Sequence, residues 1–292
     1  MSVPIVVGVD GSESALTAVK WAAEEAARHR VPLKLVHAYL LPSRGYPEVV
    51  LTGHEVRQAL EEQGRQQLAD AEAVARATAP EVDVSVALEH SGAAGAMVWE
   101  SKRARLIVLG SRGLGGFTGL LVGSVAVAVV AHGDCPVVVV RGSVTADGPV
   151  VVGVDGSPAG DRAVAFAFEA ASMRRAPLTA VLAGNDFVMD GLYGDRLPVD
   201  WAQVEQQEHV ELAERLAGWQ EQYPDVRVER AVVRDRPARA LLKSAADLGA
   251  RLLVVGSRGR GGFKGMLLGS TSQTLVYHAP CPLAVVRPPA TD

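Results

Sequence analysis

The sequence has few of the residues that build crosslinked or metal-bound proteins. Its 292 residues include only 2 cysteines, which cannot form a disulfide framework, and the spacing of Cys135 and Cys281 offers no metal site. We therefore expect a protein of the reducing cell interior. Hydrophobic residues make up 48% and charged residues 21% of the chain, a globular balance that excludes disordered and fibrous classes.

An excess of one charge and a long apolar run are also missing. Lys and Arg number 29 against 33 Asp and Glu, so no electrostatic footprint for nucleic acid or an anionic membrane is visible. The longest apolar run, 120–131, is interrupted by Gly123 and Ser124 and is far shorter than the ~20 residues of a spanning helix. The N-terminal stretch MSVPIVVGVD predicts a strand, not a signal peptide. We expect a cytoplasmic protein without nucleic-acid or membrane partners.

The chain repeats itself, which is the most informative feature of the sequence. The repeated segments are VVGVDGS at 6–12 and 151–157, GSRGLGGFTGLLVGS at 110–124 with GSRGRGGFKGMLLGS at 256–270, and CPVVVVR at 135–141 with CPLAVVR at 281–287. The repeat is much longer than the about 20–50 residues of a solenoid unit, so a whole domain is duplicated. We expect domains at 1–142 and 149–289, joined by a short polar linker.

Within each half, apolar runs rich in β-branched residues alternate with segments of helical period, which predicts an α/β fold with a parallel sheet. Strands are expected near 3–9, 33–39, 82–88, 105–110 and 136–141, and again near 149–154, 177–183, 226–232, 251–256 and 282–287. Helices are expected near 13–30, 53–79, 92–103 and 124–132, and again near 157–175, 200–223, 236–249 and 270–278. Ser12 and Ser157 are predicted helix N-caps, and Pro158 suits the first helical position.

Two glycine-bearing turns follow strands of the predicted sheet. One is residues 8–12 after the first strand, and the other is the loop 110–124 after the fourth strand, closed by a helix that begins at Ser124. Glycines permit a close approach of backbone to ligand, and the free N–H groups of a helix start attract an anion. Ligands of open parallel sheets bind at this edge. The sequence therefore predicts a phosphate cradle, in which Ser124 and its counterpart Ser270 either cap the helix or bond a phosphate oxygen.

Two common nucleotide motifs are excluded by the spacing. No GK[ST] follows a glycine as in a Walker A loop, and Asp10 and Gly11 stand where a dinucleotide fingerprint needs G-x-G-x-x-G. The pattern that is present, G-x2-G-x9-G-S, resembles the ATP-binding motif of the universal stress protein family. It occurs at Gly110, Gly113, Gly123 and Ser124 and at Gly256, Gly259, Gly269 and Ser270. The VGVDGS turn and the CPVVVV strand are also similar to that family, and the resemblance covers nearly the whole chain twice.

The resemblance implies two tandem open five-stranded parallel sheets of order 3-2-1-4-5, flanked by helices, each binding ATP with Mg²⁺. Asp10 and Asp155 would lie beside the adenine and ribose, and Ala38 and Ala183 would offer backbone to the adenine edge. With the loop arginines, the expected site residues are Asp10, Ala38, Gly110, Arg112, Gly113, Gly123 and Ser124, and Asp155, Ala183, Gly256, Arg258, Gly259, Gly269 and Ser270. We expect an ATP-binding stress-response sensor that forms homodimers, whose bound nucleotide alters its conformation or its choice of partner; the sequence does not identify such a partner.

Simpler interpretations stay open for these residues. The glycine loops can be tight turns that bind nothing, the two aspartates can be turn carboxylates, and Arg112 and Arg258 can be solvated. Both cysteines are expected to be small buried hydrophobic residues. No Ser-His-Asp set repeats in both halves, and His37 becomes Leu182. A slow nucleotide hydrolase, at most a weak ATPase, and an interaction module without nucleotide are the alternative functions.

Overall fold

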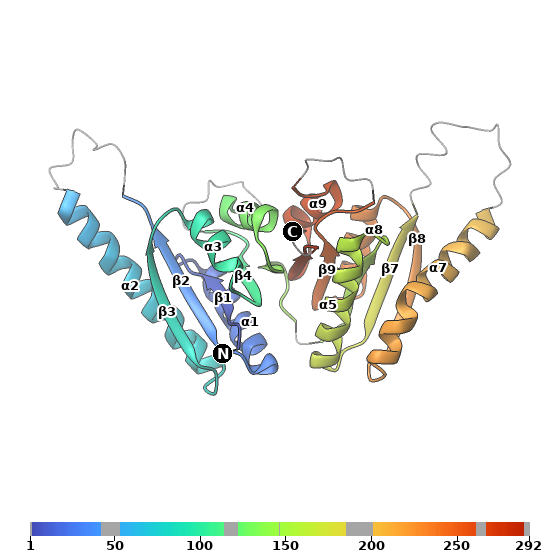
Figure 1. Ribbon diagram of the computed structural model, residues 1–292, viewed down its shortest axis with the longest axis horizontal. Coiled ribbons are helices and arrows are strands. Elements are labelled where there is room, and N and C mark those ends of the chain that lie inside the picture. The colour runs from blue at the N-terminus through green and yellow to red at the C-terminus, as the bar shows by residue number, and fades with distance from the viewer. Residues whose placement is uncertain are drawn as a thin grey trace. The chain divides into compact units, whose positions relative to one another are not determined.

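A computed structural model describes residues 2–41, 53–113, 122–145, 147–184, 201–260 and 267–288. The chain divides into two compact units, Met1–Val140 and Arg141–Asp292. The first unit contains β1 (Ile5–Gly8), α1 (Glu13–His29), β2 (Leu33–Tyr39), α2 (Gly53–Thr78), β3 (Val84–His90), α3 (Ala93–Ser101), β4 (Leu106–Gly110), α4 (Ser124–His132) and β5 (Val137–Val140). Strands and helices alternate along the chain, as Figure 1 shows by its colour gradient.

The second unit repeats this order. It contains β6 (Val150–Val154), α5 (Pro158–Arg174), β7 (Leu178–Gly184), α7 (Trp201–Gln222), β8 (Val228–Arg234), α8 (Pro237–Asp247), β9 (Leu252–Gly256), α9 (Ser270–His278) and β10 (Leu283–Val286). Every one of these elements was expected from the sequence, most of them with bounds within two residues. The duplication of the sequence is therefore a duplication of structure.

Strands pair in parallel within each unit. The order is β3-β2-β1-β4-β5 in the first unit and β8-β7-β6-β9-β10 in the second. The predicted α/β class with tandem parallel sheets is confirmed. Strands β1 and β4 are neighbours, and so are β6 and β9, so the chain reverses direction across the sheet at these pairs. Open α/β sheets bind ligands at such a reversal.

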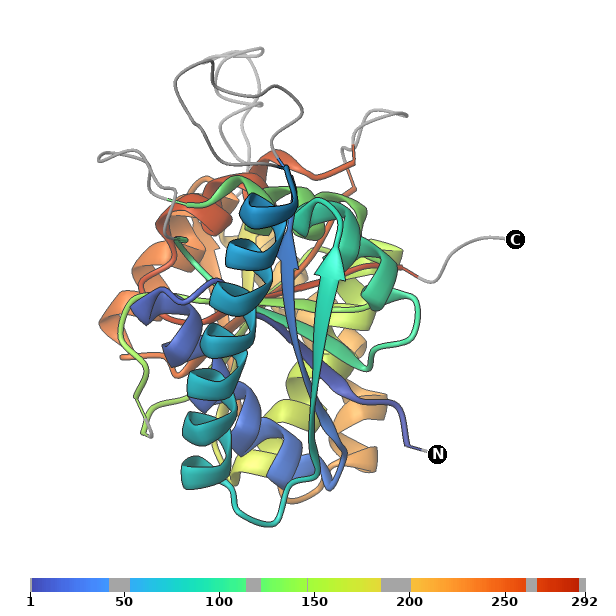
Figure 2. The ribbon, with the colours of Figure 1, turned by 90° about the vertical axis from the view of Figure 1, so that its left-hand side faces the viewer.

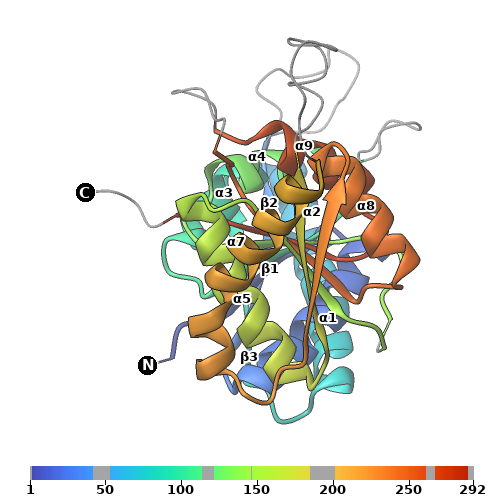
Figure 3. The ribbon, with the colours of Figure 1, turned by 90° about the vertical axis from the view of Figure 1, so that its right-hand side faces the viewer.

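Helices cover the sheet on two faces. Parallel strands need right-handed crossovers, so the reversal after β3 sends α3 and α4 to the face opposite α1 and α2. Accordingly α1 contacts α2 and α3 contacts α4. Figure 2 shows α2 alongside β2 and β3, and Figure 3 shows α7 in the same relation to β7 and β8. The inner strands are covered on both sides, which is why the first four residues of β4, Leu106–Leu109, are all apolar and buried.

Both predicted N-caps are present. The Ser12 Oγ accepts a hydrogen bond from the Ala15 N–H at 3.1 Å, and the Ser157 Oγ accepts one from the Gly160 N–H at 3.0 Å. These bonds satisfy amides that the first turn of a helix leaves without partners. They fix where α1 and α5 begin, directly after the glycine-bearing turns.

Strand β3 begins two residues later than the predicted 82–88, and β8 begins two residues later than 226–232. The reason is the turn that ends the preceding helix. The Val82 N–H bonds the Ala79 carbonyl, and the Val226 N–H bonds that of Tyr223. An apolar residue that looks like the start of a strand is used in each case to close this turn.

Candidate functional site

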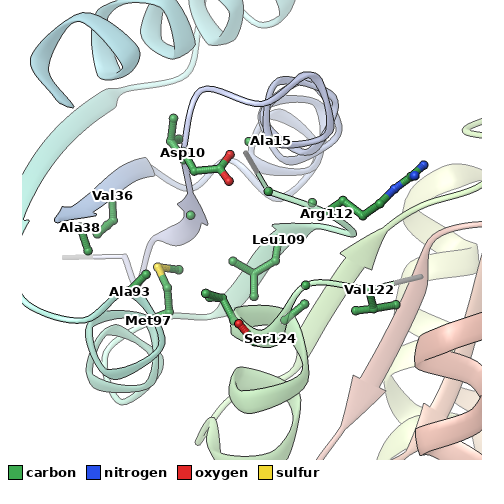
Figure 4. Close-up of a pocket in the computed structure, with 17 residues that line it drawn as sticks. Asp10, Ala15, Val36, Ala38, Ala93, Met97, Leu109, Arg112, Val122 and Ser124 are labelled. Atoms are coloured by element: carbon green, nitrogen blue, oxygen red, sulfur yellow. The ribbon is translucent and has the colours of Figure 1, made fainter. Parts of the chain in front are cut away.

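A cavity of about 470 Å³ opens in the first unit where the chain reverses direction. This volume lies in the range of about 300–1,000 Å³ typical of small-molecule sites. All seven site residues expected for the first half line it, namely Asp10, Ala38, Gly110, Arg112, Gly113, Gly123 and Ser124. Of these residues, Figure 4 labels Asp10, Ala38, Arg112 and Ser124, which lie around one common space after β1, near the end of β2, after β4 and at the start of α4.

The turn after β1 is tied to the loop after β4 through Ser12. The Asp10 carboxylate accepts hydrogen bonds from the Ser12 N–H at 3.1 Å and the Ser12 hydroxyl at 2.7 Å. The same Ser12 oxygen lies 3.2 Å from the Arg112 carbonyl oxygen. Asp10 is thus a turn carboxylate, as the simpler interpretation held, and it also lines the cavity. The two roles are compatible because the turn fixes where the carboxylate lies.

The glycines of the loop have different reasons to be glycine. A Cβ at Gly110 would lie 2.7 Å from the Ser14 backbone carbon, so packing requires this glycine. A Cβ at Gly113 would collide with the Asp10 carboxylate and displace it from its present position. Among the described residues, a Cβ at Gly123 would meet nothing closer than 3.9 Å, and the φ of −71° there suits any residue. The fold therefore does not explain Gly123, although its position beside the cavity does.

Helix α4 points its start at the cavity. Gly123 is the N-cap and has no side chain with which to cap, while Ser124, Val125 and Ala126 of the first turn line the cavity. The amides of a first helical turn have no intrahelical acceptor, and the helix dipole makes this end positive. Ser124 is the first helical residue, so the suggestion that it caps α4 is wrong. The helix start can instead receive an anionic group.

The walls of the cavity are largely apolar, which sequence reasoning missed. Val36, Ala93, Met97, Leu109 and Val122 contribute to them. Met97 is buried, as expected of a core residue, and yet its side chain also faces the space in Figure 4. The run of small residues at 93–96 was the available signal, because small side chains at the start of a helix leave room beside it.

Arg112 is exposed and contributes to the rim of the cavity. Its side chain extends away from Asp10 and Met97 in Figure 4. Its backbone is held from two sides, since the Arg112 N–H lies 3.3 Å from the Ser14 Oγ and its carbonyl lies beside Ser12. The backbone of Arg112 is therefore the part built into the site. The loop interior, 114–121, lies outside the described residues.

The second unit builds the same arrangement from its own copies. The Ser157 hydroxyl bonds the Asp155 carboxylate at 2.8 Å and the Arg258 carbonyl at 3.1 Å. A Cβ at Gly256 would lie 2.7 Å from the Ala159 backbone, matching Gly110. The other predicted residues lie at corresponding positions, with Gly259 against Asp155, Ala183 near the end of β7, Gly269 as N-cap of α9 and Ser270 as its first residue. Residues 261–266 lie outside the described part.

Ionisable groups that could do chemistry are sparse around these loops. Among the described residues, no group of three or more His, Cys, Asp or Glu side chains could hold a metal ion. The same part of the chain has no helix long and apolar enough to cross a membrane. His37 lies behind the first site, where its Nδ1–H donates to the Val9 carbonyl oxygen at 2.8 Å. This bond supports the turn that carries Asp10.

Fold and site together define a duplicated open α/β protein with a glycine-lined ligand cavity at the reversal of the sheet. A model of the universal stress protein family matches residues 1–141 and 148–287. The chain belongs to this family, which supports a role in the response to stress.

Relatives of the same length are known in mycobacteria. A universal stress protein of Mycobacterium tuberculosis is 40% identical over 296 residues, covering 98% of this chain and 97% of that protein. One of Mycobacterium bovis is 41% identical, covering 97% and 96%. Among solved structures, a universal stress protein of Archaeoglobus fulgidus superposes with a TM-score of 0.74 at 20% identity, covering 98% of this chain and 99% of that one. This last likeness shows the fold.

Proposed function

We propose that the protein is an ATP-binding regulator of a stress response, with one nucleotide site in each of two domains, 1–142 and 149–289. The observation that supports this most directly is Gly123, which borders the cavity at the start of α4. Neither its backbone conformation nor its packing against the described residues requires a glycine there. A phosphate needs close access to helix amides, and a side chain here would obstruct it. Gly269 repeats this position, since a Cβ there would make only ordinary contacts from 3.4 Å outward.

The rest of the cavity suits the other parts of the nucleotide. Its apolar wall, including Val36 and Met97, fits a flat base, and Ala38 near the end of β2 fits a backbone contact to the adenine edge. Asp10 is the carboxylate that lines the cavity and suits the ribose. Mg²⁺ binds ATP mostly through phosphate oxygens and water with few protein ligands, so a single nearby carboxylate is compatible with it.

A regulatory role fits this site better than efficient catalysis. Two unpaired, buried cysteines support the reducing cytoplasm as the location. The described residues that line the cavity include one carboxylate, Asp10, and one guanidinium, Arg112, but no histidine, cysteine or lysine that could act as a general base or nucleophile. We propose that bound ATP changes the protein's conformation or its choice of partner, with turnover far below the ~1–10³ s⁻¹ of typical enzymes.

Substitution of the two helix-cap glycines tests the proposal. Calorimetric titration should give two ATP per wild-type chain, one for Gly123→Glu, one for Gly269→Glu and none for the double variant, because a carboxylate fills the cradle and repels the phosphates. Gly218→Glu is the matched control, since Gly218 lies on α7 with open space around it and outside the cavity. Thermal unfolding should confirm that all variants fold.

Other results would replace the proposal. A folded double variant that still binds two ATP refutes the site assignment, and a wild type that binds none at millimolar ATP refutes nucleotide binding. Wild-type turnover in the enzymatic range that disappears in the double variant would favour a hydrolase instead.

A further inference from the structure

In the second unit one carboxylate on α7 holds two guanidinium groups. The Glu211 Oε1 lies 2.9 Å from the Arg215 Nη2 and 2.9 Å from the Arg260 Nη2. Arg215 adds a second bond through its Nε at 3.1 Å. Arg215 lies one helical turn further along α7, whereas Arg260 belongs to the glycine loop after β9. We call Glu211, Arg215 and Arg260 the Glu211 clamp.

Both guanidinium groups of the clamp contact the turn after β6. The Arg260 Nε–H donates to the Asp155 carbonyl oxygen. The Arg215 guanidinium lies directly against Gly156, whose φ of +67° and missing side chain make room for it. The clamp therefore joins α7, the turn that carries Asp155, and the glycine loop, which are three elements around the second site.

The first unit has neutral residues at the corresponding positions. Gln67 packs against Gly11 as Arg215 packs against Gly156, since a Cβ at Gly11 would lie 2.7 Å from the Gln67 Nε2. Four residues before it stands Gln63 in place of Glu211, and the repeat aligns Leu114 with Arg260. All three charges are thus particular to the second copy, although the glycines and aspartates around them are shared.

We propose that Glu211 is a positioning residue of the second nucleotide site, which it organises through a charged clamp that the first site lacks. This inference rests on the proposed function. Glu211 does not touch the nucleotide. It holds the Asp155 turn and the glycine loop in their binding arrangement before ATP arrives, so that less ordering remains to be done on binding.

Glu211 is the carboxylate that contacts both guanidinium groups, while Arg215 also lies 3.9 Å from the Asp161 carboxylate. The hydrogen bond from Arg215 foremost, and the charge of Arg260, hold the pKa of Glu211 below its ordinary value, so the carboxylate is ionised at neutral pH. A single exposed ion pair contributes little, but loss of this shared acid would leave two like charges beside each other and the turn. Because the three side chains are partly exposed, salt should weaken the clamp.

The test compares Glu211→Gln with Glu214→Gln, which removes the same charge from an exposed glutamate of α7. Each variant is made in two backgrounds. In Gly123→Glu only the second site can bind ATP, and in Gly269→Glu only the first site can. Titration with Mg²⁺-ATP should show a three- to tenfold loss of affinity at the second site for Glu211→Gln only. The salt dependence of the second site should also fall to that of the first.

Hydrogen exchange without nucleotide provides a readout that does not depend on ATP. The amides of residues 155–157 should exchange faster in Glu211→Gln than in Glu214→Gln, while the thermal midpoint stays the same. Arg260→Gln should have the same effect, and combining it with Glu211→Gln should add little, because both break one network.

Unchanged exchange at 155–157 in Glu211→Gln overturns the clamp, whether or not ATP binds. Faster exchange with unchanged affinity at the second site overturns its role in nucleotide binding. A wild type that binds no ATP at either site is instead a failure of the proposed function, and the exchange measurement still tests the clamp.

Discussion

Cys135 and Cys281 occupy matching places before the last strand of each unit, and both are buried. Burial raises the pKa of each thiol to about 12 from an ordinary 9.0. A thiol needs its thiolate form to react, so these cysteines are packing residues, as the sequence predicts. Neither is poised for redox chemistry.

This burial has a consequence at alkaline pH. Above about pH 9 the unfolded chain loses thiol protons that the folded chain keeps until about pH 12, so the free energy of unfolding should fall across this window. The contribution of the protonated thiols to stability is complete below about pH 9. Above this pH, each thiol lowers the free energy of unfolding by at most ~1.4 kcal/mol for each pH unit. Urea unfolding at pH 8 and pH 10 measures it.

The double variant Cys135→Ala, Cys281→Ala is the control, because lysines and tyrosines also titrate in this range. It should lose less stability between the two pH values than the wild type does. Equal losses would mean that the thiols ionise as readily in the folded chain as in the unfolded one.

At the scale of elements, the cap of α1 also builds the site. Ser12 caps the helix, bonds Asp10 and lies beside the Arg112 carbonyl. Ser12→Ala should therefore lower the free energy of unfolding by about 1 kcal/mol and weaken ATP binding at the first site. Urea unfolding and titration in the Gly269→Glu background measure the two effects.

Ser12→Thr keeps a capping hydroxyl and should retain most of both properties. Ser157→Ala should act in the same way on the second site and leave the first unaffected. Full ATP affinity in Ser12→Ala would show that the cap and the binding turn are independent.

The elements themselves could be predicted from local sequence, but the cavity only in part. Glycine spacing and the position of Asp10 follow from repeats and turns that a sequence displays directly. Apart from the small residues at 93–96, the apolar wall could not be found this way, because Val36 and Met97 look like any core residue until the sheet and α3 bring them together. The same holds for the Glu211 clamp, in which Glu211 and Arg260 are 49 residues apart in the chain but form an ion pair.

At the scale of the whole molecule, a fused duplication changes how the protein can associate. A domain that would pair with a copy of itself already has one in the same chain, which leaves other surfaces to form a symmetric dimer. We expect sedimentation at tens of micromolar to give twice the chain mass of 30.6 kDa. A single species at the mass of one chain would contradict this.

The turn after the first strand differs between the two units. Gln67 packs against Gly11 in the first unit, whereas the charged Arg215 packs against Gly156 in the second. This difference bears on how a fused chain evolves. In a dimer of identical single domains, one gene encodes both sites, so every mutation changes both of them. A mutation that improves one site but impairs the other is therefore lost. Fusion gives each copy its own codons. One site can then keep its original ligand affinity while mutations change the affinity of the other. The product of a single gene can thus respond over two ranges of ligand concentration.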